Sequence, residues 1–136
     1  MIYEATIQFI AIDNNGNDKS TKQSYIIENA ELFAQVENRL YEEFEGYTDL
    51  DVVAIKRSKI KEIANGRTSD DEKIFLATLV DVFLNDDGSE KEIKYTIAFF
   101  SKDMNTAHAY IREYVSQGYN MGVKQIKESK LIDVLK

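Results

Sequence analysis

The chain opens with hydrophobic and polar residues in alternation. In the stretch "YEATIQF", residues 3–9, every second residue is apolar, which is the period of a strand with one buried face. The "NNGN" that follows tolerates the positive φ angles of a hairpin turn, and Tyr25 and Ile27 then lie in a returning strand. The pattern predicts a β-hairpin. The apolar positions of its first strand are Tyr3, Ala5, Ile7 and Phe9.

The next segment has the period of a helix. Its apolar residues recur at spacings of three and four, so they form one stripe along a helix. Gly46 then stands where a glycine ends a helix, and Tyr47 is placed to fold back on the last turn. The strand "DVVAIKR", residues 51–57, completes a β-β-α-β unit. The helical stripe consists of Phe33, Val36, Leu40 and Phe44.

The same pattern recurs in the second half of the chain. Gly16 of "DNNG" and Gly88 of "NDDG" lie 72 positions apart (88 − 16), and "ATI" before the first turn matches "ATL" before the second. Similar shifts align "GY" at position 46 with Gly118-Tyr119, and "DVVAIKR" with "GVKQIKE". The second unit is therefore also β-β-α-β. Its returning strand contains Ile93, Tyr95, Ile97 and Phe99, and its helical stripe contains Met104, Ala107, Ile111 and Val115.

We therefore expect a tandem duplication, with one repeat at residues 1–63, a linker at 64–72 and a second repeat at 73–136. Because neither repeat alone buries much surface, the predicted fold is a single α+β domain with a pseudo-two-fold axis. We expect about six strands in a mainly antiparallel sheet, with both helices on one face. The stretch "IFLATLVDVFL", residues 74–84, is apolar on both sides. Its strand is thus either central in the sheet or has a second face that meets another molecule.

Several phrases carry a resemblance to a known family. They are "YEATIQF" near the N-terminus, "VVAIKRSKIKEI" at residues 52–63, the repeated hairpin and helix, and the terminal "LIDVL". In these the chain resembles a family of small proteins from gut bacteria and their phages, which is catalogued as a domain of unknown function. The resemblance covers nearly the whole chain. It implies a duplicated α/β domain, often carried by phages, with no assigned activity and no assigned catalytic residues.

Composition excludes several classes of function. The 136 residues contain no cysteine and one histidine, which excludes disulfides, iron–sulfur clusters, thiolate zinc sites and multi-histidine metal sites. The net charge of −7 argues against unspecific adhesion to nucleic acid or anionic membranes. No apolar run approaches the roughly 20 residues of a membrane span, and the first residues lack the features of a secretion signal. We expect a cytoplasmic protein that uses no cofactor and no membrane.

Motifs for catalysis or metal binding are missing as well. The turns around Gly16 and Gly88 do not match a calcium loop, because glycine follows three polar residues where an EF-hand needs five. His108 matches Glu37 of the first repeat, which indicates a boundary position, and no Gly-x-Ser-x-Gly or phosphate-binding glycine motif occurs. Carboxylates cluster at residues 42–45, 49–51 and 70–72, and those of the first and last clusters are most simply solubilising surface. We predict no catalytic residue, no metal site and no enzymatic activity.

Basic residues gather in two regions that the repeat makes equivalent. Beside tyrosines, such groups can hold the phosphates and stack the bases of single-stranded nucleic acid. The alternative is that lysines protect exposed sheet edges from aggregation, and the net charge of −7 favours this second interpretation. The basic residues concerned are Lys56, Arg57, Lys59, Lys61, Lys124, Lys127 and Lys130.

Three functions stay open at this point. The preferred one is a non-enzymatic binding module, a phage-associated protein that contacts or inhibits a protein partner or forms a homodimer through apolar and aromatic patches. The first alternative is an accessory protein for single-stranded nucleic acid. The second alternative is a protein that sequesters a nucleotide in a pocket between the repeats that contains Lys56 and Lys127. The contact surface of the preferred function is predicted at Leu76, Val80, Val82, Tyr110 and Tyr114.

Overall fold

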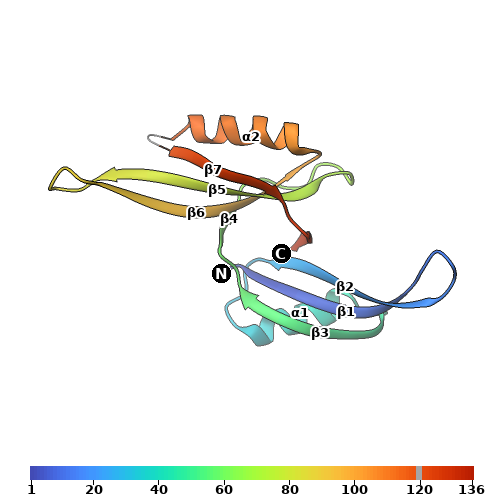
Figure 1. Ribbon diagram of the computed structural model, residues 1–136. Helices are drawn as coiled ribbons and strands as arrows, with labels where there is room; N and C mark the ends of the chain where they lie inside the picture. Colours follow the sequence, from blue (N-terminus) through green and yellow to red (C-terminus); the bar gives the residue numbers. More distant parts are fainter. Residues whose placement is uncertain (119–120) are drawn as a thin grey trace. The chain divides into compact units, whose positions relative to one another are not determined.

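The structure is a computed structural model that describes residues 1–118 and 121–136. The chain divides into two compact units (Figure 1). The first unit comprises Met1–Ser58 and Leu131–Lys136, and the second comprises Lys59–Lys130. Each unit contains one four-stranded sheet and one helix. The predicted α+β class and the mainly antiparallel strand pairing are confirmed. The expected single sheet with both helices on one face is not found: there are two sheets, each with its own helix.

Each unit contains a β-β-α-β segment, to which one further short strand is added at the end of the first unit and at the start of the second. A common origin by duplication, with a pseudo-two-fold axis, stays a prediction. The first sheet has the order β3-β1-β2-β8 and the second has the order β4-β6-β5-β7. The first unit contains β1 (Tyr3–Ile12), β2 (Asp18–Ile27), α1 (Phe33–Glu43), β3 (Thr48–Arg57) and β8 (Leu131–Leu135). The second unit contains β4 (Ile60–Ile63), β5 (Lys73–Leu84), β6 (Glu90–Ser101), α2 (Met104–Ser116), β7 (Met121–Glu128) and the connecting segments between them.

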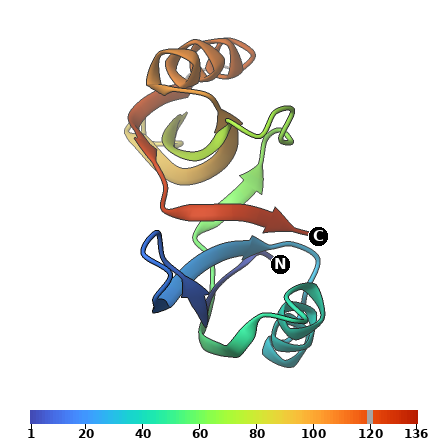
Figure 2. The same ribbon diagram turned by 90° about the vertical axis from the view of Figure 1, so that its right-hand side faces the viewer.

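The chain exchanges one short strand in each direction between the units. β4 follows β3 in sequence but pairs in parallel with β6, with Ile60 opposite Thr96. β8 follows β7 but pairs in parallel with β2 (Figure 2). In this pair Leu135 lies opposite Ile27. The compact units therefore do not coincide with the repeats at residues 1–63 and 73–136, and the expected linker is preceded by a strand that belongs to the second unit.

The core of the first unit lies between α1 and one face of its sheet. The alternating residues of β1 point into this core as predicted, and Ile7 is fully buried. Val36 and Leu40 of α1 are buried against it, and Tyr47 folds back onto Phe44 with ring centroids 5.2 Å apart. Phe33, which begins the predicted stripe, lies on the first turn and is 53% exposed. Its ring packs edge to face with that of Tyr3, with centroids 5.4 Å apart.

The core of the second unit repeats this arrangement with α2. Ala107 and Ile111 are buried against Phe75, Leu79 and other residues of the same sheet face. β5 is hydrogen-bonded on both sides, to β6 and to β7. The central position expected for the doubly apolar stretch 74–84 is therefore confirmed.

The two glycine turns have the same hydrogen bonds. In each, the amide of the glycine donates to the carbonyl three residues before it, at 3.0 Å, and both Gly16 and Gly88 have positive φ. Gly46 also has positive φ, as a helix-ending glycine should. Gly118 directly follows Gln117, the C-cap of α2, so its predicted place at the end of the helix is confirmed, but its φ is not positive. A Cβ there would lie 2.9 Å from the Cε of Met121. The prediction for Tyr119 lies outside the described residues.

Candidate functional site: a tyrosine pocket on the second unit

The predicted basic residues lie on edge strands or directly beside them. In the first unit they are on β3, and in the second unit they are on or next to β4 and β7. This placement is what the edge-protection interpretation predicts, and binding of nucleic acid or of a nucleotide stays a prediction. Lys56 and Lys127, which the nucleotide hypothesis joins in one pocket, belong to different units. The residues are Lys56 and Arg57 in the first unit and Lys59, Lys61, Lys124, Lys127 and Lys130 in the second.

The predicted apolar contact residues of β5 differ in exposure. Val80 is buried, whereas Leu76 and Val82 are half-buried. Val80 and Val82 line a pocket of about 310 Å³ together with Lys124 of β7. The walls of this pocket are mainly aliphatic, with Glu92 and Lys124 carrying opposite charges, so its lining favours no particular charge of ligand. The remaining lining residues are Met121, Gly122 and Val123.

The predicted tyrosines of α2 line a second pocket, of about 330 Å³, which we call the tyrosine pocket. Tyr110 and Tyr114 are four residues apart and therefore lie on one face of the helix. Both side chains are half-buried, and both pack against the apolar core of the second unit. The full lining consists of Ala64, Tyr110, Glu113, Tyr114 and Gln117.

The walls of the tyrosine pocket are held from several elements. The Tyr110 ring stacks on the fully buried Phe99 of β6, with centroids 5.0 Å apart and an interplanar angle of 23°. Ala64 extends the pairing of β4 through a bond from its amide to the Ala98 carbonyl, at 2.8 Å. The Asn65 side chain then bonds both the amide and the carbonyl of Phe100, at 2.7 and 3.2 Å. The pocket therefore needs little ordering to accept a ligand.

Glu62 of β4 places a carboxylate among the tyrosine hydroxyls. The Tyr114 hydroxyl donates a short hydrogen bond to Glu62 Oε1. Burial raises the pKa of Tyr114, and this hydrogen bond and the charge of Glu62 raise it further. Burial and then the charge of Glu62 also raise the pKa of Tyr110. Both hydroxyls therefore stay neutral at physiological pH, and that of Tyr114 is the donor to Glu62.

The ammonium group of Lys61 lies over the ring of Tyr95. The Lys61 ammonium lies 4.4 Å from the ring centroid of Tyr95 on β6, which is a cation–π distance. Burial raises the pKa of Tyr95, with smaller contributions from Asp81 and Glu62. Lys61, predicted as an anion-binding residue, thus has its ammonium on the ring of Tyr95.

The first unit lacks these tyrosines at the matching helical positions. The shift of 71 that aligns the two helical stripes places Arg39 at the position of Tyr110 and Glu43 at that of Tyr114. Arg39 donates to the backbone carbonyls of Glu28 and Asn29, so its side chain supports the loop before α1. The nearest likeness on α1 is Tyr41, which is 40% exposed and whose hydroxyl lies 3.5 Å from Asp51 Oδ1.

Glu62, Glu113 and Gln117 were not singled out by the sequence pattern. Glu62 was assigned to the end of the first repeat, and only the exchange of β4 brings it to α2. A usable signal was present, since Glu113 and Gln117 follow Tyr110 at spacings of three and seven and so share its helix face.

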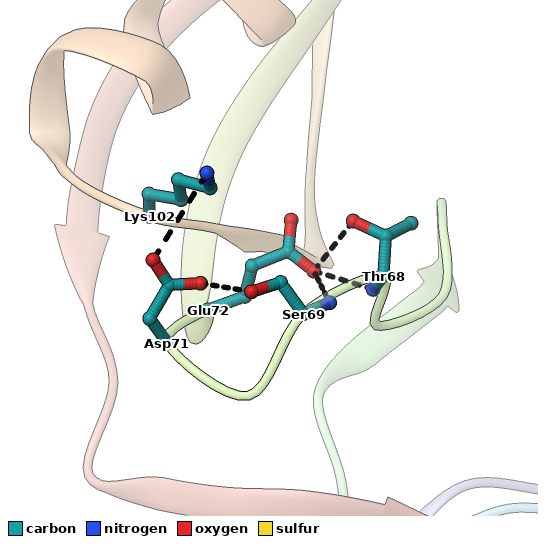
Figure 3. A network of polar contacts seen from close by, with 5 residues as sticks. All are labelled: Thr68, Ser69, Asp71, Glu72 and Lys102. Carbon is teal, nitrogen blue, oxygen red and sulfur yellow. Dashed lines mark hydrogen bonds and ion pairs between the residues drawn. The ribbon is translucent and has the colours of Figure 1, made fainter.

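The acidic stretch at 70–72 is more ordered than a solubilising surface requires (Figure 3). Glu72 Oε1 accepts bonds from the amides of Thr68 and Ser69, at 2.5 and 3.1 Å, and from the Thr68 hydroxyl at 3.0 Å. Asp71 accepts from the Ser69 hydroxyl, and the Lys102 ammonium lies 4.0 Å from its other oxygen. These bonds lower the pKa values of both carboxyl groups. The network shapes the turn that leads into β5.

The structure adds no functional contact to the remaining candidates, which are His108, a metal site and a membrane-spanning helix, among the residues that it describes. His108 lies exposed on α2. Within residues 1–118 and 121–136, no three side chains of the histidine, cysteine, aspartate and glutamate types gather closely enough to hold a metal ion. The helices that the structure describes are too short or too polar to cross a membrane. The absence of catalytic residues, metal and cofactors, and a cytoplasmic location, remain predictions.

The fold defines an α+β protein of two similar units, one of which carries the tyrosine pocket. The chain belongs to the family described as Domain of unknown function (DUF4494), whose model matches residues 1–136. No curated protein and no solved structure matches the chain.

Proposed function

We propose that this chain is a non-enzymatic protein-binding module and that the tyrosine pocket is its contact site. The observation that carries the proposal is the half-buried pair Tyr110 and Tyr114 at a pocket of about 330 Å³. Tyrosine is enriched where proteins bind, because its large ring loses little conformational entropy and its hydroxyl can form a hydrogen bond.

The difference between the units supports this choice of site. The two units share a β-β-α-β segment, the glycine turns and the buried positions of their helices. Those shared features are explained by folding. Packing on the core explains where the rings of Tyr110 and Tyr114 lie. It does not require tyrosine there, because Arg39 and Glu43 occupy the matching positions of α1.

Three further expectations stay predictions: an association with phages, an inhibitory role and a homodimer. The tyrosine pocket is compatible with each of them and is evidence for none. Binding of single-stranded nucleic acid also stays a proposal of lower rank. Its basic residues lie on or beside edge strands. At the pocket, the carboxylate of Glu113 in the lining and that of Glu62, bonded to Tyr114, repel phosphate.

A capture experiment with a matched control tests the proposal. The immobilised chain is incubated with lysate of its source cells, and bound proteins are quantified by mass spectrometry. We compare Tyr114→Ala with Tyr41→Ala, since each removes a helical tyrosine whose hydroxyl contacts a strand carboxylate. Circular dichroism confirms that both variants are folded.

The proposal predicts that a discrete protein partner is lost, by roughly tenfold or more, with Tyr114→Ala and is retained with Tyr41→Ala. Equal recovery with both variants would contradict the tyrosine pocket as the contact site.

A further inference from the structure

The tyrosine pocket combines aromatic faces with negative charge. Glu113 lines the pocket, and Glu62 accepts a hydrogen bond from the Tyr114 hydroxyl. The charge of Glu62 also contributes to the raised pKa values of Tyr95 and Tyr110. Aromatic rings and carboxylates together are the groups that bind an organic cation.

We propose that the tyrosine pocket receives a lysine or arginine side chain from a basic segment of the partner. The aliphatic part of such a side chain packs along the rings of Tyr110 and Tyr114, and its charged end bonds to Glu62 and Glu113. This inference rests on the proposed function, since it assigns the chemistry of the partner at the same site.

A contact between a lysine and a tyrosine ring, of the kind proposed for the partner, already occurs within the second unit. The Lys61 ammonium lies 4.4 Å from the centre of the Tyr95 ring, beside Glu62. Lys61 is engaged on the ring of Tyr95, which does not line the pocket. The charged residue of the pocket lining is Glu113, and Glu62 adds a second carboxylate through its hydrogen bond with Tyr114. The net charge of −7 acts in the same direction, because it attracts a basic segment from a distance.

A free cation is the simplest probe. Nα-acetyl-lysinamide and Nα-acetyl-argininamide are titrated into the full chain, and backbone amide shifts are followed by nuclear magnetic resonance. The neutral Nα-acetyl-glutaminamide serves as the control ligand. We expect saturable shifts from the two cations at residues 62–64 and 110–117, and none from the neutral amide.

Charge-removing variants give the matched comparison. Glu62→Gln with Glu113→Gln keeps an acceptor for the Tyr114 hydroxyl but removes both charges. Asp51→Asn with Glu42→Gln removes one strand charge and one helix charge from the first unit. The first pair should weaken binding of the cation by roughly tenfold, and the second should leave it within about twofold.

Shifts of equal size from the neutral amide, or unchanged affinity in the Glu62→Gln, Glu113→Gln variant, would overturn the inference. The same variants in the capture experiment distinguish the cationic contact from the proposed binding function.

A partner whose capture depends on Tyr114 but not on Glu62 and Glu113 overturns the cationic contact and leaves the binding function intact. Binding of the cation probes without any partner that depends on Tyr114 supports the cation site and contradicts the binding function.

Discussion

At the scale of single residues, this protein uses glycine and tyrosine for different purposes. Gly16 and Gly88 have φ values of 80° and 87°, a region in which a Cβ is strained, so each allows its hairpin to close. Tyr25 is a core residue, whereas Tyr114 has its ring against the core and its hydroxyl on a carboxylate. Residue type alone does not separate these roles; burial and hydrogen-bond partners do.

The glycine turns give a prediction with an internal control. Gly16→Ala and Gly88→Ala should each lower the free energy of unfolding by about 1 kcal/mol, because alanine is strained at positive φ. Gly66→Ala should change it by less than about 0.5 kcal/mol, because Gly66 has no positive φ and open space around it. Urea denaturation measures all three. Equal losses at the three positions would show that the turn conformation is not the cause.

Burial of Tyr25 gives a pH-dependent prediction. Burial, with smaller effects from Tyr47, Asp133 and Glu43, raises the pKa of Tyr25 from 10.0 to about 12. Its stabilising contribution is therefore complete below the unfolded value of 10.0 and is lost as the pH rises toward 12. Between about pH 9 and about pH 11, Tyr25→Phe should lose roughly 1 kcal/mol less unfolding free energy than the wild type. Parallel stability curves for the two proteins would contradict the raised pKa.

At the scale of elements, the exchanged strands determine which residues meet. β4 brings Glu62 to α2, and β8 covers the edge of β2. The pairing of β8 is extended by a hydrogen bond from the Glu28 amide to the Leu135 carbonyl, at 2.9 Å. Both strands are short, and each is reached through only a serine and a lysine.

Deleting residues 131–136 tests the place of β8. The first unit then loses the packing of Leu135 on its core, and β2 loses its parallel neighbour, so the free energy of unfolding should fall by about 3 kcal/mol. Hydrogen exchange should speed up at residues 24–28 and stay unchanged in β5 and β6 of the second unit. Deletion of Lys136 alone is the control. Unchanged protection of residues 24–28 would contradict the strand exchange.

The pattern of the sequence predicted the local elements well and their partners poorly. Alternation predicted β1, and spacings of three and four predicted α1 and α2, because each depends on neighbours within a few residues. Pairing between distant strands leaves no such periodicity. "IKEI" at residues 60–63 is too short to show which sheet it joins, so the position of Glu62 beside Tyr114 was not predictable.

At the scale of the whole molecule, two similar units carry unequal chemistry. The basic residues are spread over edge strands of both units, whereas the tyrosine pocket belongs to the second unit. An acidic chain with one such pocket is suited to a basic partner, and its excess negative charge speeds the encounter. We therefore predict where a partner binds: it should contact α2 of the second unit and should not contact α1.

Site-specific photo-crosslinking in the source cells tests this most directly. The photoreactive residue p-benzoylphenylalanine replaces Tyr114 in one variant and Tyr41 in the other, so both probes are aromatic replacements on a helix. If the tyrosine pocket is the binding site, we expect a discrete adduct with one protein from position 114 and no such adduct from position 41. An adduct of the same protein from both positions, or from position 41 alone, would contradict the tyrosine pocket as the binding site.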